Sequence, residues 1–154
     1  MGIKEAVHPE RVLLVRSVSK REALLEMIQC FEKRGEVKDI ESLKEKIFYR
    51  EKLMSTGIGL GIAVPHVRME GIKEPLVVIG VSGHGIEDYG AIDNQIVRIV
   101  VMIVAGKEQH QKYIKLLAGV VTHLKRPGMI EKLVNAADTQ EVYQAFMGAD
   151  HVSG

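Results

Sequence analysis

The chain has 154 residues, of which 27% are charged and 46% are hydrophobic, and its formal net charge is +1. This length suits one domain, so we expect a single domain over residues 1–154 with its core at about 12–147. The balanced charge, with no block of Lys and Arg, gives no electrostatic case for binding nucleic acid or an acidic membrane surface.

The cellular location is predicted from the single cysteine and from the missing targeting signal. Cys30 cannot form a disulfide within one chain, so the reducing cytoplasm is the simplest location. The N-terminus has no apolar stretch of signal-peptide length. The most hydrophobic run, residues 96–105, is about half of the ~20 residues that a membrane helix needs. We therefore expect a cytoplasmic protein without a membrane span.

A strand and a helix are predicted near the N-terminus. The strand is a β-branched run at residues 11–15. Ser19 and Glu22 have the spacing of a capping box at the start of the helix, and Gly35 is a candidate C-cap. A second helix is expected to begin at Asp39.

The second helix leads into a glycine-rich segment. We expect Arg50 near the C-terminal end of this helix, whose pattern directs apolar side chains toward the core: Leu43, Ile47 and Met54. Residues 57–61, Gly-Ile-Gly-Leu-Gly, are too rich in glycine for a helix. They suit a backbone that bends sharply or approaches a ligand.

Three strands are predicted in the middle of the chain. A short buried strand at residues 62–64 ends at Pro65 and His66, so the histidine should lie where a strand leaves the core. Two apolar runs, residues 76–81 and 96–105, are strand-like in their length and their Val and Ile content. Glycine, aspartate and asparagine residues between them mark turns.

A long helix is predicted from about Glu108 to a point before Pro127. Its apolar stripe contains Ile114, Leu117, Val121 and Leu124. His110 lies four residues before Ile114 and extends this stripe, so we expect it to face the interior. Two short helices should follow, after Pro127 and after Asp138. The whole pattern predicts an α/β (α+β) domain with a mixed sheet of about five strands, covered by helices on both faces.

His66 is the candidate nucleophile for phosphoryl transfer. A neutral imidazole has one unprotonated ring nitrogen at neutral pH, and its phosphoryl adduct is labile enough to be passed on. Pro65 fixes the local φ and should stiffen the backbone beside the ring. A histidine after a proline at a strand end is by itself most often a turn residue, so this feature alone does not decide the function.

Three kinds of donor could face the phosphate oxygens. Backbone N–H groups around Gly57, Gly59 and Gly61 can converge on an anion, because glycine lets the backbone come close. Arg50 can offer its planar guanidinium, and His110 can donate a hydrogen bond or carry a positive charge. Phosphoryl transfer needs little more from a protein than this alignment and charge.

Other site classes are not supported. The glycine-rich segment does not complete G-x-G-x-x-G, since Ile62 occupies the place of the last glycine, and it lacks the Lys-Ser/Thr end of a Walker A loop. The remaining histidines have neither the H-E-x-x-H spacing nor cysteine companions, so no zinc site is expected. We expect no metal and no cofactor.

The segment REKLMSTGIGLGIAVPH, residues 50–66, closely resembles the active-site signature of fructose/mannitol-type (type 2) enzyme IIA domains of the bacterial phosphotransferase system. The similarity extends from about residue 12 to residue 146. Upstream, SKREALLEMIQCFEKRGEVKDIESL resembles the first helix and turn of this family. Downstream, EQHQKYIKLLAGVVTHL resembles its long helix with a second histidine.

The resemblance implies a role for each candidate residue. The phosphorylated histidine corresponds to His66, the phosphate-site arginine to Arg50 and the auxiliary histidine to His110. Thr56 matches the Ser-Thr-Gly stretch and is implied to support the loop through its hydroxyl. The resemblance also implies that HPr donates the phosphoryl group and that a IIB protein or domain accepts it, with the membrane IIC component involved only indirectly.

Three positions depart from the usual family pattern. Val67 replaces a small residue after the histidine, Leu60 stands where a polar residue is common, and Asp93-Asn94 replaces Asp-Gly. A bulkier side chain at position 67 could alter partner docking, but none of the groups proposed for chemistry is lost.

Three functions remain open at this stage. The first is a phosphocarrier for a fructose-, mannitol- or pentitol-like sugar system. The second is a nitrogen-type regulatory paralogue, whose phosphorylation state controls binding to regulatory partners. The third is an anion-binding protein that transfers nothing. The sugar and the oligomeric state, including a homodimer, are left undecided by the sequence.

Overall fold

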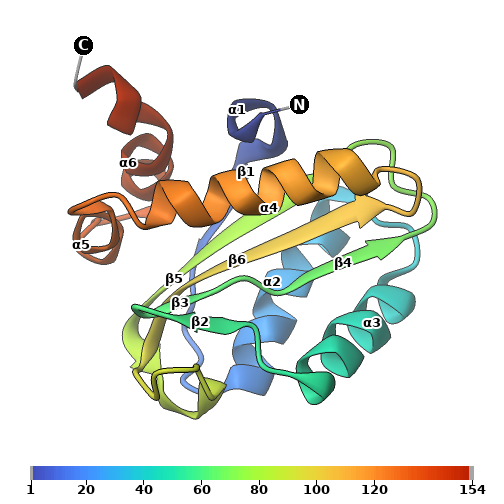
Figure 1. Ribbon diagram of the computed structural model, residues 1–154, viewed down its shortest axis with the longest axis horizontal. Helices are drawn as coiled ribbons and strands as arrows, with labels where there is room; N and C mark the ends of the chain where they lie inside the picture. Colours follow the sequence, from blue (N-terminus) through green and yellow to red (C-terminus); the bar gives the residue numbers. More distant parts are fainter. Residues whose placement is uncertain (1, 153–154) are drawn as a thin grey trace.

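The centre of the molecule is a six-stranded mixed sheet with helices on both faces (Figure 1). The computed structural model describes residues 2–152. Its elements are α1 (Ile3–Ala6), β1 (Val7–Leu14), α2 (Lys20–Arg34), α3 (Ile40–Leu53), β2 (Gly57–Gly59), β3 (Ile62–Ala63), β4 (His66–Met69), β5 (Leu76–Ile86), the 3-10 turn η1 (Glu87–Tyr89), β6 (Val97–Gly106), α4 (His110–Leu124), α5 (Met129–Val134) and α6 (Thr139–Val152). The predicted fold class is confirmed, with one strand more than expected.

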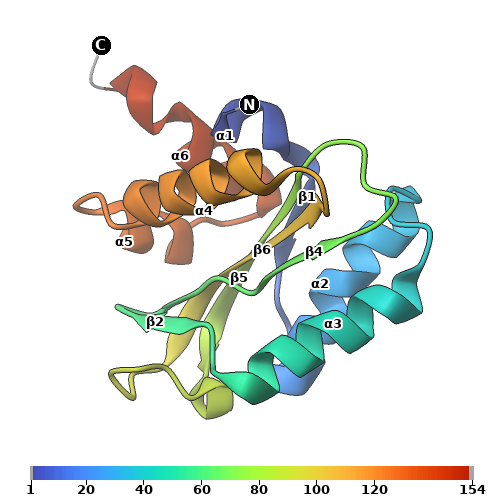
Figure 2. The ribbon, with the colours of Figure 1, turned by 45° about the vertical axis from the view of Figure 1, so that its right-hand side comes forward.

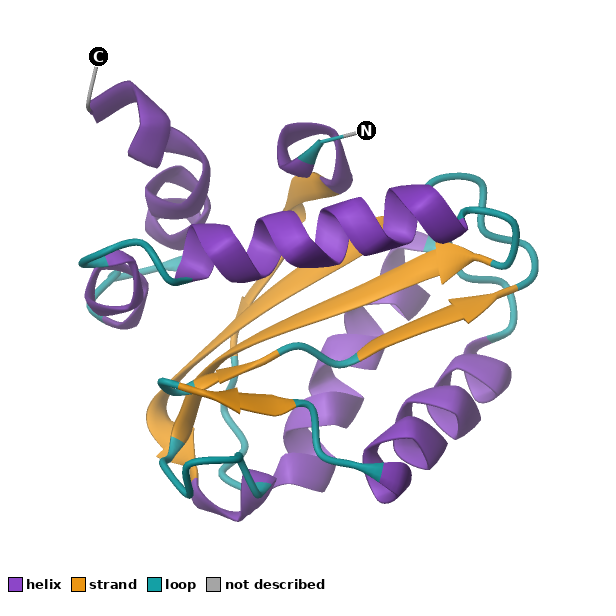
Figure 3. Cartoon of the chain, in the orientation of Figure 1, coloured by secondary structure: helices purple, strands orange, loops and turns teal. Residues whose placement is uncertain are grey.

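The strand order is β1-β5-β6-β3-β2, and β4 also pairs with β6 (Figure 3). Strand β6 is antiparallel to β5 and parallel to both β3 and β4. Strands β3 and β4 pair with β6 in the same register. Ile62 pairs with Ile99 and His66 pairs with Ile103, so the spacing of four residues is the same on both sides. Pro65 has no N–H to donate, so the ladder is interrupted just before His66.

Each face of the sheet has its own hydrophobic core. Helices α2 and α3 cover one face, where Leu24, Phe31 and Leu43 are buried. Helices α4, α5 and α6 cover the other, where Val120 and Phe146 are buried (Figure 2). Such two-sided covering explains why β6 is apolar without alternation, since its side chains are buried on both faces. None of the helices between residues 2 and 152 combines the length and hydrophobicity needed to cross a bilayer.

The predicted boundaries of α2 and α3 are confirmed. Ser19 caps α2 by accepting a hydrogen bond from the Glu22 amide at 3.2 Å, and Gly35 ends that helix with a φ of 67°. Asp39 caps α3 by accepting from an amide in the first turn at 3.0 Å. The expectation for Met54 is wrong: it follows the helix with an extended backbone and is 70% exposed.

Strand β5 is longer than predicted. Residues 83 and 85 were expected to mark turns, but the strand continues through both glycines to Ile86, and the chain turns at η1. Gly85 permits this because its backbone has a positive φ of 86°.

Helix α4 buries a stripe that overlaps the predicted one only at Leu124. Its buried positions include Tyr113, Leu116 and Val120, whereas Ile114 is 48% exposed. The prediction that His110 faces the interior is therefore wrong, and its side chain is exposed. The physical reason is a one-residue rotation: neighbouring positions on a helix point about 100° apart, and the sheet contacts the 113/116/120 face.

Candidate functional site

A cavity of about 630 Å³ lies where the end of α3, the start of β4 and one face of α4 meet. It is lined by Arg50, Met54, Ser55, Thr56, Gly57, Ile58, Val64, His66, Gly90, Ile92, Leu117 and Val121. The structure thus brings together four of the predicted site residues, all from the segment at residues 50–66. Most of the remaining lining is apolar.

The His66 ring is held in one orientation. Its Nδ1 atom lies 2.6 Å from the carbonyl oxygen of Val64. A carbonyl oxygen can only accept, so Nδ1 must carry the proton in this hydrogen bond. In the neutral ring, the lone pair is therefore on Nε2. The bond selects the tautomer in which Nε2 is the unprotonated ring nitrogen.

The surroundings also keep this ring neutral. Burial of the half-buried side chain lowers the pKa of His66 below its ordinary value, and the positive charge of Arg50 lowers it further. The hydrogen bond to Val64 and the charge of Glu51 act in the opposite direction but do not reverse the shift. The lowered pKa favours the neutral form of the His66 ring at neutral pH.

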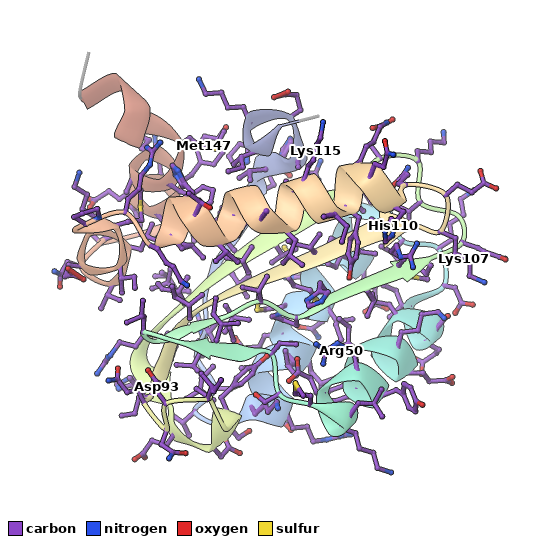
Figure 4. The ribbon with its side chains drawn as sticks, in the orientation of Figure 1. Arg50, Asp93, Lys107, His110, Lys115 and Met147 are labelled. Carbon is purple, nitrogen blue, oxygen red and sulfur yellow. The ribbon has the colours of Figure 1, made fainter. Side chains whose placement is uncertain are left out.

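Arg50 lies in the last turn of α3, and Figure 4 shows it on the side of that helix that faces the sheet. Its Nη1 atom donates to the carbonyl oxygen of Met54 at 2.6 Å. This bond satisfies one of the carbonyls that a helix leaves free at its C-terminus. A guanidinium has five N–H donors, so most of this group's donors stay available to an anion in the cavity.

Thr56 belongs to a buried polar network. Its amide donates to Oε1 of Glu51 at 3.1 Å, and its hydroxyl donates to Oε2 of the same carboxylate. The hydroxyl of Tyr89 lies 2.9 Å from Oγ1 of Thr56, and Lys20 forms an ion pair with Glu51 at 2.9 Å. Burial raises the pKa of Tyr89 far above its usual range. Thr56 is therefore tied to the Glu51 carboxylate of α3 through both its amide and its hydroxyl.

Sequence reasoning missed Glu51, Tyr89 and Lys20. Glu51 follows Arg50 directly, so on a helix the two side chains point about 100° apart, and of the two only Glu51 is buried. The sequence signal for this network was a charged residue, Glu51, at a buried position of a helix. Its partners Lys20 and Tyr89 lie too far away in sequence to be linked to it by a pattern.

The three glycines shape the backbone around the cavity. Only Gly57 lines it, and a Cβ there would lie 2.7 Å from the Cα of Ala91. Gly59 and Gly61 have positive φ values of 98° and 80° and form the tight β2–β3 hairpin. The Gly57 amide was expected to bind an anion, but it donates to the Ser55 hydroxyl at 3.1 Å. An anion would have to compete with this internal hydrogen bond.

His110 is the one predicted histidine that does not line the cavity. It is the first residue of α4, and Figure 4 shows it at the N-terminal end of that helix. One turn further on, the ring of Tyr113 contacts the His66 ring, with centroids 5.7 Å apart and planes tilted by 49°. Tyr113 was not singled out from the sequence, since an aromatic residue on a helix usually indicates only core packing.

The three departures from the family pattern have structural explanations. Val67 is buried and packs in the core on the α2 and α3 side, so its side chain points away from the site surface. Leu60 and Asn94 are the two described non-glycine residues with positive φ, at 59° and 60°. Asn tolerates this conformation better than most residues, which explains how it replaces glycine. The carboxylate of Asp93 accepts from the Leu60 amide at 3.0 Å and fixes the hairpin.

Two sequence relatives are similar to this chain over most of its length. The chain is 33% identical over 137 residues to the PTS system fructose-specific EIIABC component of Bacillus subtilis, a match that covers 88% of this chain and 21% of that protein. It is 28% identical over 153 residues to the nitrogen regulatory protein homolog of Haemophilus influenzae, covering 95% of this chain and 91% of the relative. The chain therefore spans about a fifth of the first relative and nearly all of the second.

A solved structure has the same fold. The complex of enzyme IIAMTL and phosphorylated enzyme IIBMTL from Escherichia coli contains a chain with a TM-score of 0.72 and 25% identity, covering 92% of this chain and 97% of that chain. The family model described as phosphoenolpyruvate-dependent sugar phosphotransferase system, EIIA 2, matches residues 5–148. This match over most of the chain identifies it as a member of the EIIA 2 family of the phosphotransferase system.

Proposed function

We propose that the protein is a phosphocarrier in which Nε2 of His66 accepts a phosphoryl group from the phosphohistidine of an HPr-type protein and passes it to a IIB protein. One observation carries the proposal: the 2.6 Å bond from Nδ1 to the Val64 carbonyl leaves the Nε2 lone pair free in the cavity. The chain would act as a protein phosphotransferase that needs neither metal nor nucleotide.

The transfer balances without an added proton. The Nε2 lone pair forms a bond to phosphorus while the P–N bond of the donor phosphohistidine breaks, and that electron pair returns to the donor imidazole. Throughout the transfer, Nδ1 of His66 keeps its proton and donates it in the hydrogen bond to the Val64 carbonyl. The positive charge that the phosphorylated ring then carries is stabilised by this acceptor. Donation to a IIB protein repeats the same step in reverse.

Arg50 is the proposed ligand of the phosphoryl oxygens. Its guanidinium is held at the edge of the cavity by the Met54 carbonyl and bears a charge that complements the transferring group. Thr56 and Gly57 would hold the adjoining loop, whereas Gly59 and Gly61 would act through the hairpin. His110 enters through the family resemblance, and its exposed side chain would be accessible to a docked partner.

A IIB protein is the proposed acceptor because the solved structure similar to this chain is a complex of IIAMTL with phosphorylated IIBMTL. The Bacillus subtilis relative is fructose-specific, which supports a sugar system of that class. Both exchanges would take place in the cytoplasm.

A nitrogen-type regulatory function is the second candidate. The observation in its favour is the similarity to the nitrogen regulatory protein homolog of Haemophilus influenzae, which is 28% identical over 153 residues. In this alternative the same phosphohistidine would control binding to a regulatory protein instead of feeding a transporter.

Phosphorylation by phosphoenolpyruvate, enzyme I and HPr tests the proposal. Intact mass spectrometry should show one added phosphate on the wild type and on His84→Ala, a variant of an exposed histidine. His66→Ala should gain none. A wild type without phosphate, or a fully phosphorylated His66→Ala, would contradict the proposal. Discharge by a IIB protein then supports sugar transport, whereas a stable phosphohistidine that changes affinity for a regulatory partner supports the second candidate.

A further inference from the structure

A second set of side chains approaches His66 from the α4 side of the sheet. Tyr113 is 8% exposed, and its ring contacts the His66 ring at a centroid distance of 5.7 Å. The guanidinium carbon of Arg68 lies 5.7 Å from the centroid of the same tyrosine ring. The three side chains thus form a continuous row: imidazole, phenol and guanidinium.

The geometry of β4 explains why Arg68 belongs to this row. Successive side chains of a strand point to opposite faces, so His66 and Arg68 share one face while Val67 between them points to the other. The burial pattern agrees, because Val67 is buried, whereas His66 is half-buried and Arg68 is exposed. Two residues along a strand span about 6.6 Å, well within the reach of an arginine side chain.

Arg68 is also held in place. Its Nη1 atom donates to the carbonyl oxygen of Lys107 at 3.3 Å, and its cation lies over the electron-rich face of Tyr113. Burial raises the pKa of the Tyr113 phenol, and the charges of Arg68 and Arg50 act against that shift. Tyr113 therefore lies within the electrostatic influence of both guanidinium groups, one from β4 and one from α3.

We propose that Arg68 is a second cationic ligand of the phosphoryl group on His66, and that Tyr113 is the positioning residue that holds both the His66 ring and the Arg68 side chain. The inference rests on the proposed phosphocarrier function and deepens it. Arg50 would contact the phosphoryl oxygens from the α3 side and Arg68 from the α4 side. Two guanidinium groups match a group that carries about two negative charges spread over three oxygens.

A small-molecule phosphoryl donor distinguishes a role of Arg68 as a phosphoryl ligand from a role in partner docking. With phosphoramidate, the Nε2 lone pair of His66 forms the new N–P bond, the P–N bond of the donor breaks, and ammonia leaves with that electron pair. No partner protein is present, so only groups at the phosphorylation site can alter the rate. We would follow the full chain by ³¹P nuclear magnetic resonance.

Arg68→Gln should react with phosphoramidate about tenfold more slowly than the wild type, because one charge-assisted contact to the transferring group is lost. Arg68→Lys should recover part of the rate. The matched control is Lys115→Gln, which removes an exposed cation from the helix that carries Tyr113 and should leave the rate unchanged. Equal rates for Arg68→Gln and Lys115→Gln would overturn the role of Arg68.

Tyr113 is tested by a pair of substitutions. Tyr113→Phe keeps the ring and should keep the rate within about twofold, whereas Tyr113→Leu removes the ring contact and should slow the reaction about tenfold. A merely structural residue would leave the His66 ring where it is, so the ¹⁵N shifts and pKa of His66 are the second readout. Tyr113→Leu should change both, and Tyr113→Phe should change neither. Folding of each variant is checked by its thermal unfolding midpoint.

The failures of the two proposals are distinguishable. If the wild type gains no phosphate from either HPr or phosphoramidate, the phosphocarrier function itself is wrong. If the wild type is phosphorylated and Arg68→Gln and Tyr113→Leu react at its rate, only the present inference is wrong. If Arg68→Gln slows the reaction with HPr alone, Arg68 belongs to partner docking and is not a phosphoryl ligand.

Discussion

His66 and Val64 are joined by a hydrogen bond between side chain and backbone, two residues apart, at the point where the sheet ladder is interrupted by Pro65. The 2.6 Å contact from Nδ1 to the carbonyl oxygen leaves Nε2 as the unprotonated ring atom. A single local bond thus leaves Nε2 as the nitrogen that the proposed transfer would phosphorylate. It depends on the short gap between β3 and β4, which turns the carbonyl toward the ring.

The first prediction concerns the protonation of His66. Its pKa in the folded protein should lie below the ordinary value of about 6.5, mainly because the ring is buried. Arg50→Gln should raise this pKa, since the nearby positive charge is removed. A two-dimensional ¹H–¹⁵N titration of the histidine rings measures both. A wild-type pKa at or above 6.5, or no rise in Arg50→Gln, would contradict the prediction.

The same shift has a consequence for stability. A histidine whose pKa is lower in the folded state binds fewer protons there than in the unfolded chain, so the free energy of unfolding rises with pH. The contribution of His66 is present above about pH 6.5 and is lost as the pH falls through the folded pKa. Urea unfolding at pH 7.5 and pH 5.5 should show this loss in the wild type and a smaller loss in His66→Gln.

The second prediction concerns the buried network below the site. Glu51→Ala should lower the free energy of unfolding by about 3 kcal/mol, because it leaves Lys20 and the Thr56 hydroxyl without their shared carboxylate. It should also slow phosphorylation, since Thr56 adjoins the cavity. Glu45→Ala removes an exposed carboxylate from the same helix and is the matched control. Similar unfolding midpoints for the two variants in urea would refute the role of the network.

Local parts of the fold could be predicted well from sequence. The ends of α2 depend on a few neighbouring residues, such as Ser19, Glu22 and Gly35, and the structure confirms each of them. The buried face of α4 could not be predicted, because two adjacent stripes are both apolar. One begins at Tyr113 and the other at Ile114, and only docking against the sheet selects between them.

The same contrast between local sequence patterns and long-range contacts applies to the candidate site. His66 and Arg50 were found because a continuous segment carries both, and the structure places them in one cavity. Glu51 and Tyr89 are 38 residues apart, yet their side chains meet at 3.3 Å. No sequence pattern links residues that far apart. The contact of Tyr113 with His66 was missed because an aromatic residue on a helix usually indicates only core packing.

The third prediction concerns Val67, a departure from the family pattern that, from sequence, could alter partner docking. Its side chain is 7% exposed and packs on the α2 and α3 side of the sheet, away from the site surface. Val67→Ala should therefore lower the free energy of unfolding by about 2 kcal/mol through the lost packing. The rate of phosphorylation by HPr should stay within about twofold of the wild type. A large rate effect with unchanged stability would restore the docking interpretation.

The fourth prediction concerns the close approach of two backbone segments beside the cavity. A Cβ on Gly57 would lie 2.7 Å from the Cα of Ala91, and a backbone atom in a hydrogen-bonded loop cannot move aside easily. The Gly57 carbonyl also accepts from the Ile92 amide at 3.1 Å, so separating the segments would break this bond. Gly57→Ala should lower the free energy of unfolding by about 2 kcal/mol. It should also slow phosphorylation, because the displaced loop lines the site.

Gly83→Ala is the matched control for this substitution. A Cβ at Gly83 meets no atom within 4 Å, and its φ is not positive, so the added methyl group fits without strain. The exposed Gly83 lies in a strand, where alanine also restricts the unfolded chain more than glycine does. Its free energy of unfolding should stay within about 0.5 kcal/mol of the wild type or rise slightly. If urea unfolding gives Gly57→Ala the same stability as Gly83→Ala, the contact with Ala91 does not constrain the loop, and glycine at position 57 needs another explanation.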